Sequence, residues 1–389
     1  MKILSLFLNN EIRTGGHRRL LDLYENFGKS ESSVFVILNN DLQYVPQFFL
    51  FEKVSCKYHR KKIPPISSVF KKCVAHFSDT LTEKIKQADV LLVFGETHLA
   101  AALYLKNKYD IPVIYGHRSN TVRECLINIG DKSASIGVKI TGILTLIFYR
   151  HYEKRIARQC DCIVMQSPYD KKDFCTRNPS ATPKVHIIRG NIGLPHFLPQ
   201  YDSINKSESL HKIVFVGTLG TRKGLRHLLD AMDILQSRGI NTLELDIIGP
   251  GENIEEWRQW LVTHKMAERI HLYGRVSDPF PYIGQADLLV VPSDFDSYPD
   301  TVLEGLYTGT PVIGSITGGI PDMLQYEELL FPIQDPSAIA NRIEKLFRNN
   351  DFYMQVRSLC SKRKDFFTFD WIDEWKKLAE KIISEKRKT

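Results

Sequence analysis

Short apolar runs alternate with helical patterns along most of the chain. The apolar runs of residues 1–205 include Lys2–Leu8, Val34–Leu38, Val90–Phe94, Pro112–Tyr115 and Cys162–Met165. The later runs include Ile213–Gly217, Leu243–Ile248, Ile270–Tyr273 and Ala286–Pro292. Uninterrupted apolar runs are typical of strands buried on both faces, and helices between them favour a parallel sheet. The pattern therefore predicts an α/β protein with two Rossmann-like halves.

The length of 389 residues suits two domains better than one hydrophobic core. The polar segment Asp202–Ser209 contains few apolar residues and is typical of a linker. We therefore expect one domain over residues 1–205 and a second over residues 206–365. An amphipathic pattern over residues 366–389 predicts a closing helix.

Composition indicates an ordinary soluble globular protein, with 43% hydrophobic and 25% charged residues. The seven cysteines are an odd number, and they form neither a Cys-x-x-Cys pair nor a metal-binding spacing. The N-terminal apolar run is short and lacks a small-residue cleavage site, so it is typical of a first strand. These features predict reduced thiols and a cytoplasmic location.

Charge is distributed unevenly along the chain. Residues 1–200 contain 29 Lys and Arg against 17 Asp and Glu, a net charge of +12, whereas the whole chain carries +7. The remaining residues therefore carry −5. A basic N-terminal half suggests contact with an anionic surface or acceptor. No nucleic-acid-binding module is recognisable, so we expect an anionic membrane leaflet, not nucleic acid, as the partner.

The most apolar stretch is Ile136–Tyr149. It is shorter than the ~20 residues that a transmembrane helix needs. Two interpretations remain open, a buried core helix and a helix lying at the surface of an anionic membrane. The second is favoured by flanking basic residues, namely Lys132, Lys139, Arg150, Lys154, Arg155 and Arg158.

Candidate chemistry is concentrated in residues 296–322, DSYPDTVLEGLYTGTPVIGSITGGIPD. Asp296 lies in a polar loop, and Glu304 follows eight positions later in the predicted helix Thr301–Tyr307. The start of that helix would offer backbone N–H groups to an anion. Carboxylates beside such a site suit a sugar nucleotide, because its hydroxyls need acceptors and its diphosphate needs donors.

Two glycine turns also have the form of anion-binding sites. Gly217–Gly224 joins a predicted strand to a predicted helix and contains Arg222 and Lys223, which can bind phosphate oxygens. Gly15 and Gly16 form a shorter turn between the first strand and the next helix. His98 and His117 follow predicted strands, where the carboxyl ends of a parallel sheet line a binding crevice.

Asp296-x7-Glu304, followed by Gly309-Thr310-Pro311-Val312 and Gly318-Gly319-Ile320-Pro321-Asp322, resembles the signature of glycosyltransferase family 4. This large family contains retaining, metal-independent sugar-nucleotide transferases with the GT-B fold, in which two Rossmann-like domains face an interdomain cleft. The family pattern is Glu-x7-Glu, so Asp296 is one methylene shorter than the usual residue.

The resemblance implies that residues 1–205 bind the acceptor and residues 206–365 bind the nucleotide sugar, while the helix of residues 366–389 returns to the first domain. It implies catalytic roles for Asp296, Glu304 and His117. Asp296 would accept hydrogen bonds from the donor sugar, and Glu304 from the ribose. The implied donor-binding residues are Gly15, Gly16, Arg222, Lys223, Tyr298, Thr301, Val302 and Glu304.

The expected diphosphate-binding arginine and the question of a bound metal each need a comment. The arginine of the family pattern corresponds to Thr218, so Arg222 is expected to replace it. Asp294-Phe295-Asp296 has the spelling of a metal-binding motif, but the spacing from Asp296 to Glu304 explains Asp296 better. The resemblance therefore implies neither a metal nor another cofactor.

The functional expectation is a retaining glycosyltransferase that uses a nucleotide-sugar donor and a glycan or lipid-linked acceptor. It would act in cell-surface polysaccharide or glycolipid synthesis, on the cytoplasmic face of the membrane. The alternative is a non-catalytic subunit that binds a sugar nucleotide. A phosphorylase or sugar-nucleotide epimerase would share the fold. An oxidoreductase is disfavoured because no Gly-x-Gly-x-x-Gly follows the first strand.

Overall fold

The computed structural model describes residues 1–8, 15–29, 33–39, 50–54, 78–130, 136–192, 207–251 and 254–388. The chain forms two compact units. Unit 1 contains Met1–Arg189 together with Asp370–Thr389, and unit 2 contains Gly190–Phe369. Most of the predicted linker Asp202–Ser209 lies outside the described residues.

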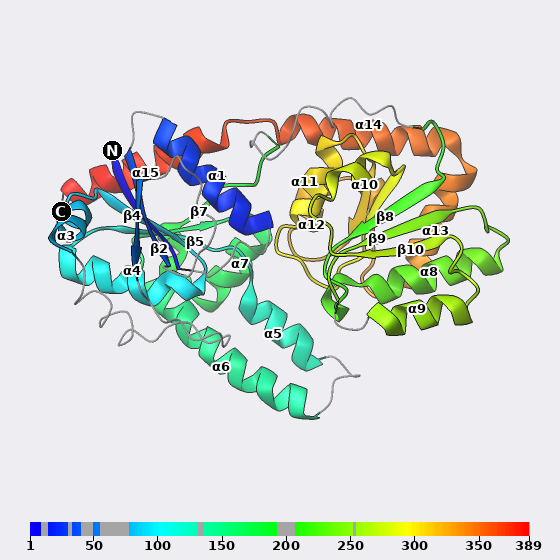
Figure 1. The fold of residues 1–389 in the computed structure, drawn as a ribbon, viewed down its shortest axis with the longest axis horizontal. Helices are drawn as coiled ribbons and strands as arrows, with labels where there is room; N and C mark the ends of the chain where they lie inside the picture. The colour runs from blue at the N-terminus through cyan, green and yellow to red at the C-terminus, as the bar shows by residue number, and fades with distance from the viewer. Residues whose placement is uncertain are drawn as a thin grey trace. The chain divides into compact units, whose positions relative to one another are not determined.

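Unit 1 is built on a parallel sheet that has seven strands within the described residues, in the order β3-β2-β1-β4-β5-β6-β7 (Figure 1). Its strands are β1 (Lys2–Phe7), β2 (Ser33–Asn39), β3 (Leu50–Val54), β4 (Val90–Phe94), β5 (Val113–Gly116), β6 (Cys162–Met165) and β7 (Val185–Ile187). Its helices are α1 (Gly15–Lys29), α3 (Asp79–Lys86), α4 (Glu96–Tyr109), α5 (Thr121–Gly130), α6 (Ile136–Gln159), α7 (Pro168–Arg177), η1 (Pro179–Lys184) and α15 (Trp371–Arg387).

Unit 2 repeats this design with a parallel sheet of six described strands, in the order β10-β9-β8-β11-β12-β13. Its strands are β8 (Lys212–Val216), β9 (Glu244–Ile248), β10 (Ile270–Gly274), β11 (Leu288–Val291), β12 (Val312–Ser315) and β13 (Leu330–Phe331). Its helices are η3 (Thr221–Lys223), α8 (Leu225–Ser237), α9 (Ile254–Thr263), α10 (Phe280–Gln285), α11 (Asp300–Tyr307), α12 (Ile320–Leu324), η4 (Glu327–Leu329), α13 (Pro336–Arg348) and α14 (Asn350–Phe366).

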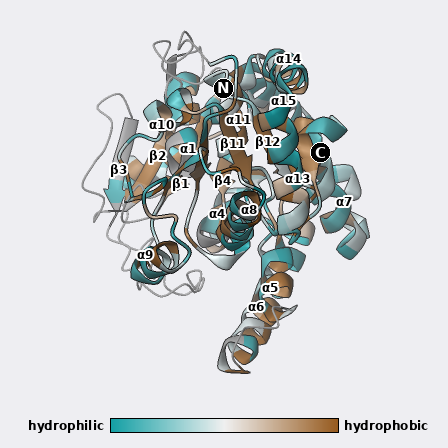
Figure 2. Ribbon diagram, turned by 90° about the vertical axis from the view of Figure 1, so that its right-hand side faces the viewer, coloured by the Kyte–Doolittle hydropathy of each residue, from teal (hydrophilic) through white to brown (hydrophobic). Residues whose placement is uncertain are grey.

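Both sheets owe their stability to strands that are apolar on both faces. The residues of β4, β5, β6 and β11 are all buried, as their uninterrupted apolar sequences predict. These strands form the hydrophobic centre of each unit (Figure 2). The order of the strands reverses between β1 and β4 in unit 1, and between β8 and β11 in unit 2. Ligands of open α/β sheets bind at such reversals.

The predicted closing helix begins later than expected. Phe366 is the last residue of α14, and a short break precedes α15, whose start is capped by the Asp370 side chain accepting a hydrogen bond from the Asp373 amide. α15 buries Trp371, Trp375 and Leu378 within unit 1.

The apolar stretch at residues 136–149 forms only the first part of α6. The helix continues to Gln159 and pairs with α5 in a hairpin (Figure 1). Ile136 and Leu144 are 78% and 64% exposed, so the stretch is not a core helix. Among the described residues, no helix has both the length and the apolar character needed to cross a bilayer.

Candidate functional site

The candidate donor site of unit 2 lies where the strand order reverses. β8 leads into the glycine turn that carries Arg222 and Lys223, and β11 leads into the loop that carries Asp296. Because β8 and β11 are neighbouring parallel strands, both loops leave the same edge of the sheet. Residues 74 positions apart in sequence therefore meet at this edge.

The turn that holds the two cations is pressed against the end of β11. Lys223 closes a short 3₁₀ turn and is followed by Gly224, which has a φ of +69°. A Cβ atom at Gly224 would lie 1.9 Å from the Pro292 carbonyl oxygen, so only glycine fits this position. The Asp294 amide also donates a hydrogen bond to the Arg222 carbonyl over 2.9 Å. These contacts fix the cation turn relative to the acidic loop.

Asp296 is buried and lies between both cations. The Lys223 Nζ donates a hydrogen bond to Asp296 Oδ2, and the Arg222 guanidinium lies 3.9 Å from the same oxygen. Arg222 also donates to the Phe295 carbonyl over 3.1 Å. Gly318 lies directly against this loop, since a Cβ there would lie 1.9 Å from the Asp296 carbonyl oxygen. The structure thus brings together three of the predicted site residues.

The remaining predicted donor residues of unit 2 lie in or just before α11. Thr301 and Glu304 are half-buried, so both have surface that a ligand can contact. Tyr298 is buried, and its ring lies 6.5 Å from that of Phe367. The Val302 side chain is fully buried and its amide donates to the Pro299 carbonyl. Val302 therefore contributes to the position of the helix through packing.

Asp294 has a structural environment that the sequence did not reveal. One carboxylate oxygen lies 3.0 Å from His227 Nε2, and the other accepts a hydrogen bond from the Gln334 amide over 3.1 Å. The Asp294 carbonyl accepts another from the Thr317 hydroxyl. This side chain is buried and already bonded, so it stabilises the loop that presents Asp296.

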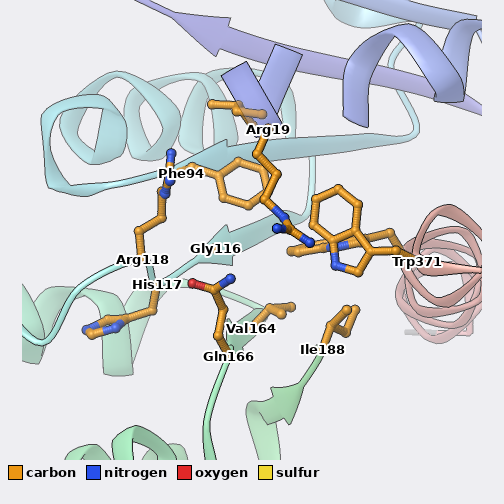
Figure 3. A pocket seen from close by; sticks show the side chains of 11 residues that line it. Arg19, Phe94, Gly116, His117, Arg118, Val164, Gln166, Ile188 and Trp371 are labelled. Carbon is orange, nitrogen blue, oxygen red and sulfur yellow. The ribbon is translucent and has the colours of Figure 1, made fainter. Parts of the chain in front are cut away.

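A pocket of about 390 Å³ opens in unit 1 at the carboxyl ends of its strands (Figure 3). Its lining residues are Arg19, Leu20, Phe94, Gly116, His117, Arg118, Val164, Gln166, Ile188, Trp371 and Trp375. The Arg19 guanidinium lies 5.0 Å from the centre of the Trp371 ring, and the Gln166 amide is turned toward them (Figure 3). Gly116 leaves room for the Phe94 ring, whose Cδ1 would be 2.2 Å from an added Cβ.

The pocket is rich in hydrogen-bond donors. The indole N–H groups of Trp371 and Trp375 are buried and have no hydrogen-bond partner among the described residues. Buried polar groups are usually paired, and leaving one unpaired is costly. With the guanidinium groups of Arg19 and Arg118, these donors suit a ligand that presents several oxygen atoms. The sequence placed the two tryptophans on one helix face but could not place Arg19 beside them.

His117 lies at the edge of this pocket, with its ring turned away from Arg19 and Trp371 (Figure 3). Its ring packs against Tyr115 and Phe174, and burial, reinforced by the nearby Arg177 charge, lowers its pKa from 6.5 to about 4. The imidazole is therefore neutral at pH 7, with one N–H donor and one acceptor nitrogen. The uncharged ring can therefore donate a hydrogen bond to a hydroxyl group or accept one from it.

His98 has a structural role instead. Its Nε2 accepts a hydrogen bond from the Leu8 amide over 3.0 Å, so its Nδ1–H donates to the Phe94 carbonyl over 2.7 Å. Burial lowers its pKa to about 4. The ring ties the end of β1 to the end of β4. Gly15 and Gly16 are the first residues of α1, so the prediction that they form a turn is wrong; residues 9–14 lie outside the described residues.

Comparison with known sequences matches part of unit 2 to a family. Residues 211–349 match the model of the group 1 glycosyl transferases. The mannosylfructose-phosphate synthase of Agrobacterium fabrum is 22% identical over 254 residues, which are 60% of this chain and 54% of that protein. An uncharacterized glycosyltransferase of Haemophilus influenzae is 23% identical over 97% of this chain and 99% of its own length. The chain spans about half the length of the first curated relatives it matches.

Solved structures share the complete fold. The sucrose-phosphate synthase of Thermosynechococcus elongatus superimposes with a TM-score of 0.77 at 17% identity, covering 99% of both chains. Anabaena HepE in complex with UDP-glucose has a TM-score of 0.72 at 14% identity, covering 99% of this chain and 100% of its own. WaaG, a glycosyltransferase of lipopolysaccharide biosynthesis, has a TM-score of 0.71 at 15% identity, covering 98% and 99%. The two sheets therefore form a GT-B fold, and residues 211–349, which include the segment 296–322, match the group 1 glycosyl transferases.

Proposed function

We propose that this protein transfers a sugar from a nucleotide-sugar donor to a glycan or lipid-linked acceptor, with retention at the anomeric carbon. The observation that carries the proposal is the meeting of Arg222 and Lys223 with Asp296 at the strand reversal of unit 2. This cluster lies inside the region that matches the family model.

The donor diphosphate would bind the two cations of this cluster. Two positive charges face one carboxylate, so an excess of positive charge is available to an anion. A diphosphate that binds Lys223 weakens its pairing with Asp296. The Asp296 carboxylate is then able to accept hydrogen bonds from the donor sugar, while the cations stabilise the charge of the departing diphosphate. In this scheme the protein cations take the place of a divalent metal.

The remaining parts of α11 complete the proposed donor site. The half-buried Glu304 accepts hydrogen bonds from the ribose hydroxyls, and the backbone around Thr301 binds phosphate oxygens. The backbone of Gly15 and Gly16, at the start of α1, is proposed as a further diphosphate contact. The Anabaena relative whose structure holds UDP-glucose supports a nucleotide sugar as the class of donor.

The acceptor would bind the pocket of unit 1. Its arginines and unpartnered indole N–H groups suit an oxygen-rich acceptor with a negatively charged group, and the neutral His117 would contact the reacting sugar. Relatives that act in amylovoran and lipopolysaccharide biosynthesis support a role in cell-surface polysaccharide or glycolipid synthesis. An acceptor of this kind would also bring the protein to the cytoplasmic face of a membrane.

The substitution Glu304→Ala tests this assignment. We expect transfer to fall by roughly 100-fold or more, because a hydrogen-bond partner of the ribose is lost from a preorganised site. The assay incubates each common nucleotide sugar with lipid and glycan acceptors and measures product mass. Glu256→Ala, an exposed carboxylate of the same unit, is the matched control and should keep wild-type turnover.

Two outcomes would contradict the proposal. Wild-type turnover by Glu304→Ala would remove Glu304 from the site. Binding of a nucleotide sugar without turnover, for every donor and acceptor, would instead favour the non-catalytic subunit. Asp296 is the reason for considering a non-catalytic subunit, because it replaces the usual glutamate and is paired with Lys223.

A further inference from the structure

The hairpin of α5 and α6 extends away from the sheet of unit 1 and carries an uncovered apolar face (Figure 1). In the described part of this unit, every exposed large hydrophobic side chain lies on this hairpin, namely Leu126, Ile136, Ile140, Ile143, Leu144 and Ile147. On α6, Ile143 and Leu144 are adjacent, and each lies three or four positions from Ile140 and from Ile147, while Ile136 lies four before Ile140, so the five residues form one stripe along the helix. We call these five residues the apolar stripe.

The same face of α6 becomes basic beyond the apolar stripe. His151, Lys154 and Arg158 continue the spacing of three or four residues after Ile147, and all three are exposed. Glu153 is the single acidic residue in the α6 sequence, and it is buried in ion pairs with Arg177 and Arg150. The exposed charge of α6 is therefore entirely positive.

The apolar stripe and the positive charge of α6 together indicate what kind of partner this helix binds. The apolar stripe covers twelve residues, or about 18 Å of helix, which is too short to cross a bilayer. A helix with an exposed apolar face and a set of cations lies in the membrane interface, with its apolar side chains among the acyl chains and its cations near anionic headgroups. The same face of a second copy would offer these cations no exposed carboxylate, because the single acidic residue of α6, Glu153, is buried.

We propose that the α5–α6 hairpin docks this protein on an anionic lipid bilayer, with the apolar stripe inserted in the interface and Lys154 and Arg158 contacting lipid phosphates. The hairpin is joined directly to the pocket of unit 1. A smaller cavity of about 240 Å³ is lined by His117 together with Val122 of α5 and Tyr149 and Ile156 of α6. If the proposed function holds, docking keeps the pocket beside the lipid surface that carries the acceptor.

The test uses the full chain and sedimentation with vesicles of phosphatidylcholine alone or containing phosphatidylglycerol. We expect binding to the anionic vesicles that weakens as salt is raised. Leu144→Asp combined with Ile147→Asp should reduce binding by roughly tenfold or more, because charges enter the interface. Lys154→Glu combined with Arg158→Glu should reduce it by a similar factor and flatten the salt dependence, since each basic residue contributes about 1 kcal/mol.

Matched variants control for general changes in surface character. Val262→Asp removes an exposed apolar side chain of α9, and Lys172→Glu reverses an exposed charge of α7; both should bind vesicles as wild type does. Wild-type binding by both double variants would overturn the proposal. A second result would also overturn it. Light scattering without lipid would show that the wild-type protein is a dimer and that Leu144→Asp combined with Ile147→Asp converts it to a monomer. Nucleotide-sugar binding should be unchanged in every variant. A variant that lost it would have a damaged donor site, which distinguishes failure of the proposed function from failure of membrane docking.

Discussion

At the scale of single residues, the pairing of Lys223 with Asp296 determines the charge that a donor meets. Lys223 neutralises the buried Asp296 carboxylate, so the pair is close to neutral, and Arg222 adds the excess positive charge. The sequence predicted the three residues separately, from a glycine turn and from a family motif. It could not predict their contact, because that depends on β8 and β11 being neighbours.

The buried histidines predict how the stability of the protein depends on pH. His98 has a pKa of about 4 in the folded chain and about 6.5 when unfolded, so below pH 6.5 the unfolded state binds the additional proton. The free energy of unfolding should therefore fall as the pH falls from 6.5 toward 4, by at most about 3 kcal/mol for this residue. His117 adds a similar contribution.

Urea denaturation between pH 7 and pH 5 measures this effect before most carboxylates are protonated. His98→Asn should lower stability at pH 7, because two hydrogen bonds are lost, and it should also lessen the decline toward pH 5. His151→Gln alters an exposed histidine and should leave the decline unchanged. A decline in His98→Asn as steep as in wild type would show that folding does not lower the pKa of His98.

At the scale of elements, strands buried on both faces were the most predictable part of the fold. β4, β6 and β11 follow apolar runs of the sequence, because nothing polar is tolerated on either face. The short strands β3 and β13 were not predicted. β13 contains two residues, and so brief a segment has no period that a sequence pattern can reveal.

The α6 helix shows that composition alone does not predict whether an apolar helix is buried. The apolar sequence of residues 136–149 was equally compatible with burial and with an interfacial position, because both require isoleucine and leucine at helical spacing. The structure decides the matter, since Ile147 is 63% exposed while Tyr152 and Ile156 on the opposite side of the helix are buried. Only the tertiary arrangement shows which face lacks a partner.

The turn between β8 and α8 provides a prediction about stability and binding together. Gly224→Ala places a methyl group against the Pro292 carbonyl and forces an unfavourable backbone angle, so we expect a loss of about 2–4 kcal/mol in unfolding free energy. Nucleotide-sugar binding should weaken as well, because this contact holds Lys223 beside Asp296.

Gly239→Ala separates the two causes. Gly239 has a similar φ of +80°, but an added Cβ would meet nothing within 4 Å. This variant should lose only about 1 kcal/mol, from backbone strain alone, and should bind nucleotide sugar normally. Equal losses in the two variants, measured by chemical denaturation, would mean that the Pro292 contact contributes nothing.

At the scale of the whole molecule, repetition of the same α/β plan in two units was readable from the sequence. The pocket of unit 1 was not, because it combines Arg19 near the N-terminus with Trp371 and Trp375 near the C-terminus. The amphipathic pattern of the closing helix indicated that its tryptophans are buried, but not which residues surround them. The charge asymmetry of the sequence agrees with cations in that pocket and on α6.

Binding of nucleotide sugars tests the central claim, that Lys223 and Arg222 hold a donor diphosphate. Calorimetric titration of the full chain with a panel of nucleotide sugars should give at least one specific ligand. Lys223→Ala should weaken its binding by roughly 100-fold, since a charge-assisted contact contributes about 1.5–3 kcal/mol and Asp296 loses the hydrogen bond from Lys223. Lys362→Ala, an exposed lysine of the same unit, should bind as wild type does. Wild-type affinity in Lys223→Ala would contradict the account.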